Sequence, residues 1–128
     1  MQYEARLVAV DDSIEEEVTV RIGDVELCCF ANRGHPGDLD RIYQVELSLQ
    51  DVGGWRLEAL GDVDLEPRIT RVGSGYGYVL VGRLDGLRLD AGVLFVDACF
   101  ADYAYLSGTR VRVHVDRIGI DFLDDTAR

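Results

Sequence analysis

The 128-residue sequence predicts a single all-β domain, either a small antiparallel barrel (OB-like or related, and partly open) or a two-sheet sandwich of about eight or nine short strands. Hydrophobic and polar residues alternate with a period of two along most of the chain, which is the pattern of half-buried strands. Turn-forming residues recur at roughly 8–15-residue spacing, as they do between short antiparallel strands. Two separate domains would each lie near the lower size limit for burying a core, so we expect one domain over residues 1–128, with a frayed tail at 123–128.

The first strand shows the alternation in its simplest form. Tyr3, Ala5, Leu7 and Ala9 fall on one face, and charged residues stand between them. The same pattern predicts further strands in the first half of the chain, at about residues 16–22, 25–31, 41–50 and 55–60.

Turn-forming residues separate these strands. Gly23-Asp24 lies between two alternating runs and predicts a two-residue hairpin turn. Residues 32–38 contain two glycines and a proline, so they predict a loop. Before residue 16 the pattern has two interpretations. Ser13 and Glu16 have the spacing of a helix capping box, whereas the β-branched alternation that follows favours a strand.

The second half continues the pattern, with strand character at residues 68–72 and on both sides of a hairpin turn at Asp85-Gly86. Residues 93–100 form a nearly continuous apolar run, which predicts a central strand covered on both faces. Residues 109–116 alternate again, with valines facing inward. After Asp116 the apolar residues change parity, and such a one-residue slip predicts a β-bulge near Asp116–Arg117.

The chain is strongly acidic, with a formal net charge of −11, and its basic residues are all arginine. The absence of lysine excludes a lysine Schiff base and a P-loop lysine. Residues 1–64 hold 15 carboxylates and 5 arginines, so most of the negative charge lies in the first half. Such a surface repels phosphate, and we therefore expect no nucleic-acid partner and no attachment to an anionic membrane. The N-terminus lacks the features of a signal peptide, which favours a cytoplasmic protein.

The densest group of charges is the acidic segment between the first two predicted strands. Five carboxylates occur within seven residues there, which are Asp11, Asp12, Glu15, Glu16 and Glu17. A solvated, solubilising face is one interpretation of this segment. The other is a recognition surface for a basic protein partner, because opposite charges raise the rate and specificity of association. A non-enzymatic interaction module, such as an inhibitor or immunity-type protein, would have this size and charge.

A second candidate site is a pocket lined by Asp97, Tyr103 and Tyr105. Asp97 interrupts the apolar run at 93–100, where burial would raise the pKa of a carboxyl group and suit it to acid–base chemistry. The two tyrosines follow closely and would supply an aromatic wall. This combination suggests a small-molecule-binding barrel or an enzyme. No nucleophile or second acid accompanies Asp97 in the sequence, so we assign no catalytic residue and favour a protein without enzymatic activity.

The cysteines do not form a recognisable metal site or disulfide framework. Cys28 and Cys29 are adjacent, so on a strand they would point to opposite faces, and Cys99 is distant in sequence. We therefore expect reduced thiols, no metal and no cofactor. A third functional class, a structural subunit whose strands pair in a homo-oligomer, also fits this sequence.

Overall fold

The computed structural model describes residues 2–11, 13, 16–50, 56–61, 66–73 and 76–123. Within these residues the chain forms eleven β-strands and one 3₁₀ helix, η1 (Ala98–Leu106). The predicted all-β class is confirmed, and the described residues contain more strands than the eight or nine expected. Several strands are only three or four residues long, which explains why periodicity alone did not separate them.

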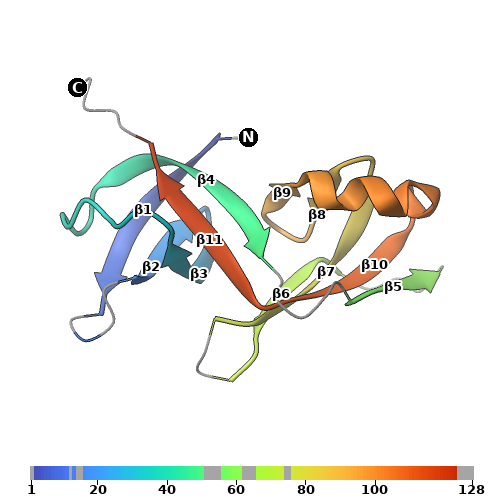
Figure 1. Cartoon of the computed structure of the whole chain (residues 1–128), viewed down its shortest axis with the longest axis horizontal. Helices are drawn as coiled ribbons and strands as arrows, with labels where there is room; N and C mark the ends of the chain where they lie inside the picture. The colour runs from blue at the N-terminus through green and yellow to red at the C-terminus, as the bar shows by residue number, and fades with distance from the viewer. Residues whose placement is uncertain are drawn as a thin grey trace. The chain divides into compact units, whose positions relative to one another are not determined.

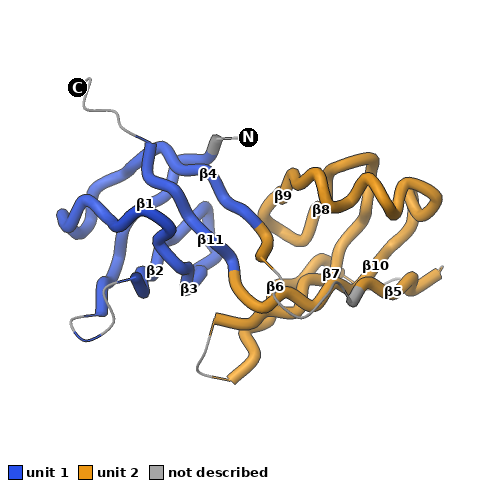
Figure 2. The backbone as a smooth tube through the Cα atoms, in the orientation of Figure 1, with its two compact units in different colours: residues 1–48, 118–128 blue, residues 49–117 orange. Residues whose placement is uncertain are grey.

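The strands divide into two compact units, which Figure 2 distinguishes by colour. Unit 1 comprises residues 1–48 and 118–128, and unit 2 comprises residues 49–117. The chain leaves unit 1 near the end of one strand and returns at the beginning of another, so unit 2 is an insertion within unit 1. A single cooperatively folding domain is a statement about folding behaviour, and it stays a prediction.

Unit 1 is built around a closed five-stranded barrel (Figure 1). Its strands follow one another around the barrel in the order β1-β2-β3-β11-β4, and β3 and β11 are parallel. This is the strand order of an OB-type barrel, so the predicted small barrel is confirmed for this unit. Its strands are β1 (Gln2–Val10), β2 (Glu17–Ile22), β3 (Val25–Ala31), β4 (Ile42–Gln50) and β11 (Arg117–Phe122).

Alternate residues of these strands fill the barrel interior, as the period of a strand requires. The fully buried side chains include Leu7, Val18, Val20, Leu27, Val45, Ile118 and Ile120. The predicted inward position of Ala9 is wrong, because the pairing of β1 with β2 shifts register between Leu7 and Ala9. Val8 is the extra residue, and beyond it Val10 rather than Ala9 lies opposite the buried Val18.

Unit 2 contains an antiparallel sheet in which β7 is the central strand. The main order is β5-β10-β7-β8-β9. β6 and β8 share one edge of β7, where β6 pairs with residues 78–81 and β8 pairs with residues 83–85. These strands are β5 (Arg56–Gly61), β6 (Arg68–Arg71), β7 (Tyr78–Asp85), β8 (Arg88–Asp90), β9 (Leu94–Val96) and β10 (Arg110–Val115).

One face of this sheet forms the core of unit 2. Its inward side chains include Leu80, Leu84, Leu89, Phe95, Val111 and Val113, all of them buried. η1 contacts β7, and its residue Phe100 is completely buried. The opposite face of the sheet carries charged side chains, among them the exposed Arg83, Asp85, Arg88 and Asp90.

Two predicted features of unit 2 are wrong in detail. Residues 93–100 do not form a central strand. Leu94–Val96 form the edge strand β9, and Asp97 then begins η1. The hairpin between β7 and β8 turns at Gly86 and Leu87, one residue later than predicted, because Asp85 and Arg88 pair with each other. Gly86 has a φ of 63°, a conformation that glycine adopts without strain.

The parity change at Asp116 is a strand break rather than a bulge inside one strand. β10 ends at Val115 and β11 begins at Arg117, and the two strands belong to different sheets. The apolar residues change parity there because the chain passes from the sheet of unit 2 to the barrel of unit 1.

Gly82, on the buried face of β7, lies directly against the backbone at the end of β8. A Cβ atom at this position would lie 2.0 Å from the carbonyl oxygen of Asp90, closer than non-bonded atoms can approach. We therefore predict that Gly82→Ala lowers the free energy of unfolding by about 2–3 kcal/mol, since the β7–β8 backbone must move. Urea unfolding monitored by circular dichroism measures this loss.

Gly77→Ala is the matched control for this substitution. A Cβ atom at Gly77 would meet nothing closer than 3.6 Å, so the same chemical change should cost much less. Equal unfolding midpoints for the two variants would contradict the predicted packing of β7 against the end of β8.

Candidate functional site

The described carboxylates of the acidic segment are Asp11 and Glu16, which lie between β1 and β2, and Glu17, the first residue of β2. The backbone N–H of Asp11 donates to the carbonyl oxygen of Glu17 at 3.2 Å, which brings the two ends of the connection together. The Asp11 carboxylate accepts a hydrogen bond of 2.7 Å from the backbone N–H of Ser13. The carbonyl oxygen of Glu16 accepts from Ala31 at the end of β3 at 2.7 Å. Asp12 and Glu15, the other predicted members, lie outside the described residues.

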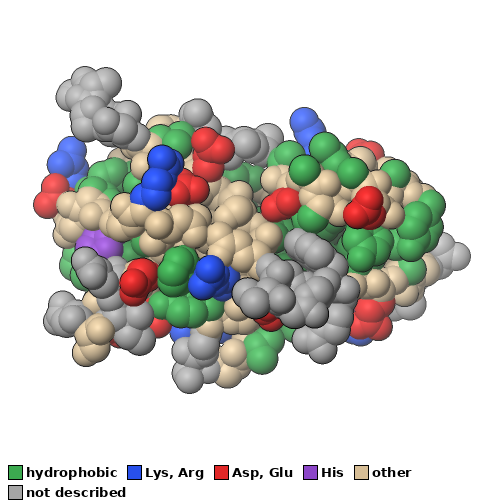
Figure 3. Space-filling model, viewed as in Figure 1, with side chains coloured by type: hydrophobic (Ala, Val, Ile, Leu, Met, Phe, Trp, Pro, Cys, Tyr) green, Lys and Arg blue, Asp and Glu red, His purple; other side chains and the backbone are tan. Residues whose placement is uncertain are grey.

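The described arginines of unit 1 interact with oxygens other than the carboxylates of Glu16 and Glu17. Arg21 pairs with Glu26 at 2.5 Å, Arg41 pairs with Asp38 at 3.3 Å, and Arg33 pairs with Asp121 at 3.2 Å. Arg6 donates to the backbone carbonyl oxygen of Asp40 at 2.7 Å. In the space-filling view, arginines of unit 1 accordingly lie beside carboxylates (Figure 3). Every arginine in the described part of unit 1 therefore has an oxygen partner elsewhere.

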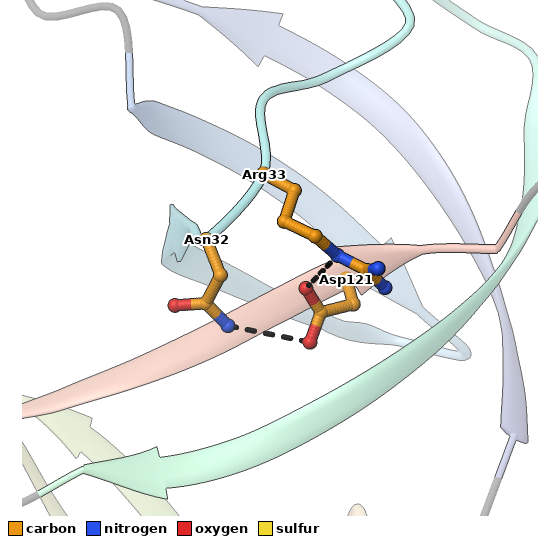
Figure 4. A network of polar contacts seen from close by, with 3 residues as sticks. All are labelled: Asn32, Arg33 and Asp121. Atoms are coloured by element: carbon orange, nitrogen blue, oxygen red, sulfur yellow. Dashed lines mark hydrogen bonds and ion pairs between the residues drawn. The ribbon is translucent and has the colours of Figure 1, made fainter.

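Arg33 points its guanidinium group at Asp121 of β11 (Figure 4). Its Nε donates to Asp121 Oδ1, and Asn32 Nδ2 donates to Asp121 Oδ2 at 3.4 Å. The backbone N–H of Asn32 also donates to Ile120 at 3.1 Å, so the residues after β3 are tied to β11. Arg33, the arginine that follows β3, therefore pairs with Asp121 and not with Glu16.

Several carboxylates of unit 1 consequently have no cationic partner among the described residues. Over its full sequence unit 1 holds 14 carboxylates and 5 arginines, a net charge of −9, whereas unit 2 holds 10 and 8, a net charge of −2. The described carboxylates of unit 1 whose side chains make neither an ion pair nor a hydrogen bond are Glu16, Glu17, Asp24, Asp40 and Glu46. Glu16 and Glu17 are the two that adjoin each other, and they belong to the predicted acidic segment.

Asp97 has a structural role at the beginning of η1. Its side chain accepts a hydrogen bond from the backbone N–H of Cys99 at 3.0 Å, which is the capping interaction of a helix N-terminus. Its second oxygen accepts from the backbone N–H of Leu49 at 3.1 Å. Both oxygens of the half-buried carboxylate are therefore used to hold η1 to the last residues of β4.

Asp97 lies at the beginning of η1, whereas Tyr103 and Tyr105 lie at and beyond a kink within it. The two tyrosine rings lie near each other, with centroids 6.5 Å apart, but Tyr105 is 78% exposed. The pair forms a surface feature of η1, and the predicted pocket around these three residues stays a prediction.

All three cysteines are free thiols. Burial raises the pKa of the Cys29 thiol far above its usual range, and nearby Cys28 raises it further. Burial also raises the pKa of Cys99, and its hydrogen bond with Asp97 adds to this increase. The described residues contain no group of three or more His, Cys, Asp or Glu side chains that could hold a metal ion.

Sequence reasoning missed two surface pockets. One, of about 210 Å³, lies on unit 1 and is lined by Glu4, Arg6, Arg21, Gly23 and Ile42. The other, of about 320 Å³, lies on unit 2 and is lined by Arg83, Asp85, Arg88, Asp90 and Leu94. The sequence does contain a signal for the second pocket. The spacing Arg-x-Asp occurs on both sides of Gly86, and alternate residues of a hairpin share one face.

Comparison with known proteins places the chain in a family. The family model described as uncharacterised conserved protein UCP019853 matches residues 1–123. The chain belongs to this family. The match extends over both units, so the UCP019853 pattern includes the barrel and the inserted sheet together. No curated protein and no solved structure matches the chain. None of the helical residues in the described ranges forms a segment long and apolar enough to cross a bilayer.

The contact between Asp97 and Cys99 leads to a prediction that combines stability with pH dependence. Asp97→Ala removes the cap of η1 and should cost about 1–2 kcal/mol of unfolding free energy. The same change removes a negative charge and a hydrogen bond that oppose thiolate formation, so the pKa of Cys99 should fall. The rate of iodoacetamide alkylation, followed against pH, measures that pKa.

A lower pKa moves the midpoint of the rate profile to lower pH. Because burial also raises the pKa of Cys99, greater exposure of the thiol would shift the midpoint in the same direction, and the plateau rate reports that exposure separately. Asp102→Ala, which removes the weaker of the two neighbouring charges, should move the midpoint less. An unchanged midpoint in Asp97→Ala would contradict the described contact.

Proposed function

We propose that this protein is a non-enzymatic interaction module of the cytoplasm that binds a basic protein partner. The binding surface is the acidic surface, defined as Asp11, Asp12, Glu15, Glu16 and Glu17. One observation carries the proposal: the described arginines of unit 1 all interact with other oxygens, which leaves the Glu16 and Glu17 side chains without cations. A partner that supplies arginine or lysine would compensate them.

The position of the acidic surface supports this role. In OB-type barrels the connection between the first two strands borders the face that binds ligands. Here that connection carries carboxylates, which repel phosphate and attract cationic side chains. Charge complementarity of this kind accelerates association and excludes partners of the wrong sign.

An inhibitor or immunity-type protein is the specific form of interaction module that we favour. Such a protein must find and neutralise a cationic target quickly, and a dense acidic surface serves this purpose. The described structure also assigns both Asp97 oxygens to backbone N–H groups, so that carboxylate is occupied in holding η1.

The proposal predicts that Glu15→Gln, Glu16→Gln and Glu17→Gln together weaken partner binding while leaving the melting temperature nearly unchanged. Three lost charge interactions of about 0.5 kcal/mol each correspond to roughly tenfold weaker binding. The immobilised protein would be exposed to lysate of its own source cells at low salt. The basic protein released as salt rises would then be purified and its affinity measured for both forms.

Asp24→Asn, Asp40→Asn and Glu46→Gln provide the matched control. This triple variant loses the same charge from the same unit, at carboxylates that also lack ion pairs. We expect it to retain most of the affinity, since only long-range attraction is reduced. Capture that survives the Glu15, Glu16 and Glu17 substitutions at moderate salt would rule the acidic surface out.

A further inference from the structure

The pocket on unit 2 is bordered by charges of both signs. Its volume is about 320 Å³, and the residues that line it are Arg83, Asp85, Arg88, Asp90 and Leu94. Pockets that bind small molecules have volumes from about 300 Å³ upward. The pocket on unit 1, at about 210 Å³, is smaller than this, and one of its arginines, Arg21, already pairs with Glu26. The pocket on unit 2 is therefore the stronger candidate for a ligand site.

The strand pairing arranges the charges of this pocket as two pairs of opposite sign. Arg83 of β7 lies opposite Asp90 of β8, and Asp85 lies opposite Arg88, with all four residues exposed. Neither pair forms an ion pair, and Arg83, Asp85 and Arg88 make no side-chain hydrogen bond in the described part of the chain. The lining residues thus carry two positive and two negative charges, which sum to zero.

A third strand adds an apolar side chain beside one of these pairs. Leu94 of β9 lies opposite Asp90 in the pairing of β8 with β9. Arg83, Asp90 and Leu94 therefore form one row across β7, β8 and β9. Neighbouring strands lie about 4.8 Å apart, so this row extends over about 10 Å. It presents a cation, an anion and an apolar group in that order.

Hydrogen bonds hold the central carboxylate and the turn of the hairpin in place. Asp90 Oδ1 accepts from the backbone N–H of Gly92 at 3.1 Å, which fixes the carboxylate through one oxygen only. The backbone N–H of Gly86 donates to Ser107 Oγ at 3.0 Å, and Ser107 directly follows η1. The turn between β7 and β8 is therefore tied to the end of η1. A site that is held in this way loses less conformational entropy when a ligand binds.

We propose that this pocket binds a free α-amino acid with an apolar side chain. Arg83 binds the carboxylate, Asp90 Oδ2 accepts from the ammonium group, and the side chain lies against Leu94. A simple anion or a simple cation meets as many like charges as opposite ones in this pocket, whereas a zwitterion gains attraction at both of its charges. The site goes beyond the proposed function and does not depend on the acidic surface, whose residues belong to unit 1.

Titration of the isotopically labelled full chain with L-leucine, followed by NMR, tests the proposal. Ion pairs at exposed positions are weak, so we expect a Kd of about 1 mM. The amide signals that shift and saturate should belong to residues 83–94.

Three truncated ligands test each element of the amino acid on the unaltered chain. 4-Methylpentanoate lacks the ammonium group of leucine, 3-methylbutylamine lacks its carboxylate, and glycine lacks its side chain. Each should bind about tenfold more weakly than L-leucine, because each leaves one member of the row without its counterpart.

Substitutions in the row should have the same effect. Arg83→Gln and Asp90→Asn should each weaken L-leucine binding about tenfold, and the asparagine keeps an oxygen that can accept from Gly92. Arg21→Gln is the matched control, since it makes the same change in the pocket on unit 1 and should leave the affinity unchanged.

Three results would overturn the inference. The first is the absence of shifts at residues 83–94 with L-leucine well above the expected Kd. The second is binding of 4-methylpentanoate or 3-methylbutylamine as tightly as L-leucine, which would make the pocket a site for a simple ion. The third is an equal loss of affinity in Arg21→Gln and Arg83→Gln. The first two results come from the unaltered chain and do not depend on whether a variant folds.

Discussion

Closure of the barrel by β11 is the constraint on which the rest of the fold depends. The last strand must lie between β3 and β4, although 66 residues separate the end of β4 from the start of β11. The inserted unit must therefore begin and end at one place. The structure meets this condition through Gln50, whose carbonyl oxygen accepts from Asp116 at 3.0 Å and whose side chain accepts from Arg117. Asp116 and Arg117 are also where the chain changes from one sheet to the other.

The two units differ in net charge, which is −9 over unit 1 and −2 over unit 2. Each unit has its own buried residues, so exposed positions in one can change charge without affecting packing in the other. In unit 1 the described arginines interact with carboxylates or with a backbone carbonyl oxygen, and Glu16 and Glu17 have no cation beside them among the described residues. On the outer face of the unit 2 sheet, Arg83, Arg88 and Arg112 lie opposite Asp90, Asp85 and Glu58 in register.

The all-β class and most strand positions could be predicted from the sequence, because alternation over six or more residues reflects a half-buried strand directly. The prediction failed where tertiary structure outweighed local pattern. In residues 93–100 the side chain of Asp97 accepts hydrogen bonds from the backbone N–H groups of Cys99 and Leu49, and β9 ends and η1 begins at this residue. At Ala9 a register shift in the pairing with β2 reversed the inward face.

The candidate sites show a similar division. The density of carboxylates at residues 11–17 is visible in the sequence, but the lack of a described cation beside Glu16 and Glu17 is not. Arg33 pairs with Asp121, which is 88 residues later in the chain, because the parallel pairing of β3 and β11 brings the two residues together.

The most direct test of the charge separation is a titration of the isotopically labelled chain with a short oligo-arginine peptide, followed residue by residue by NMR. The account predicts that the first amide signals to shift belong to residues 11–17 and to the adjoining end of β3, and that the shifts disappear at high salt. Shifts that begin in unit 2, or that spread evenly over both units, would contradict it.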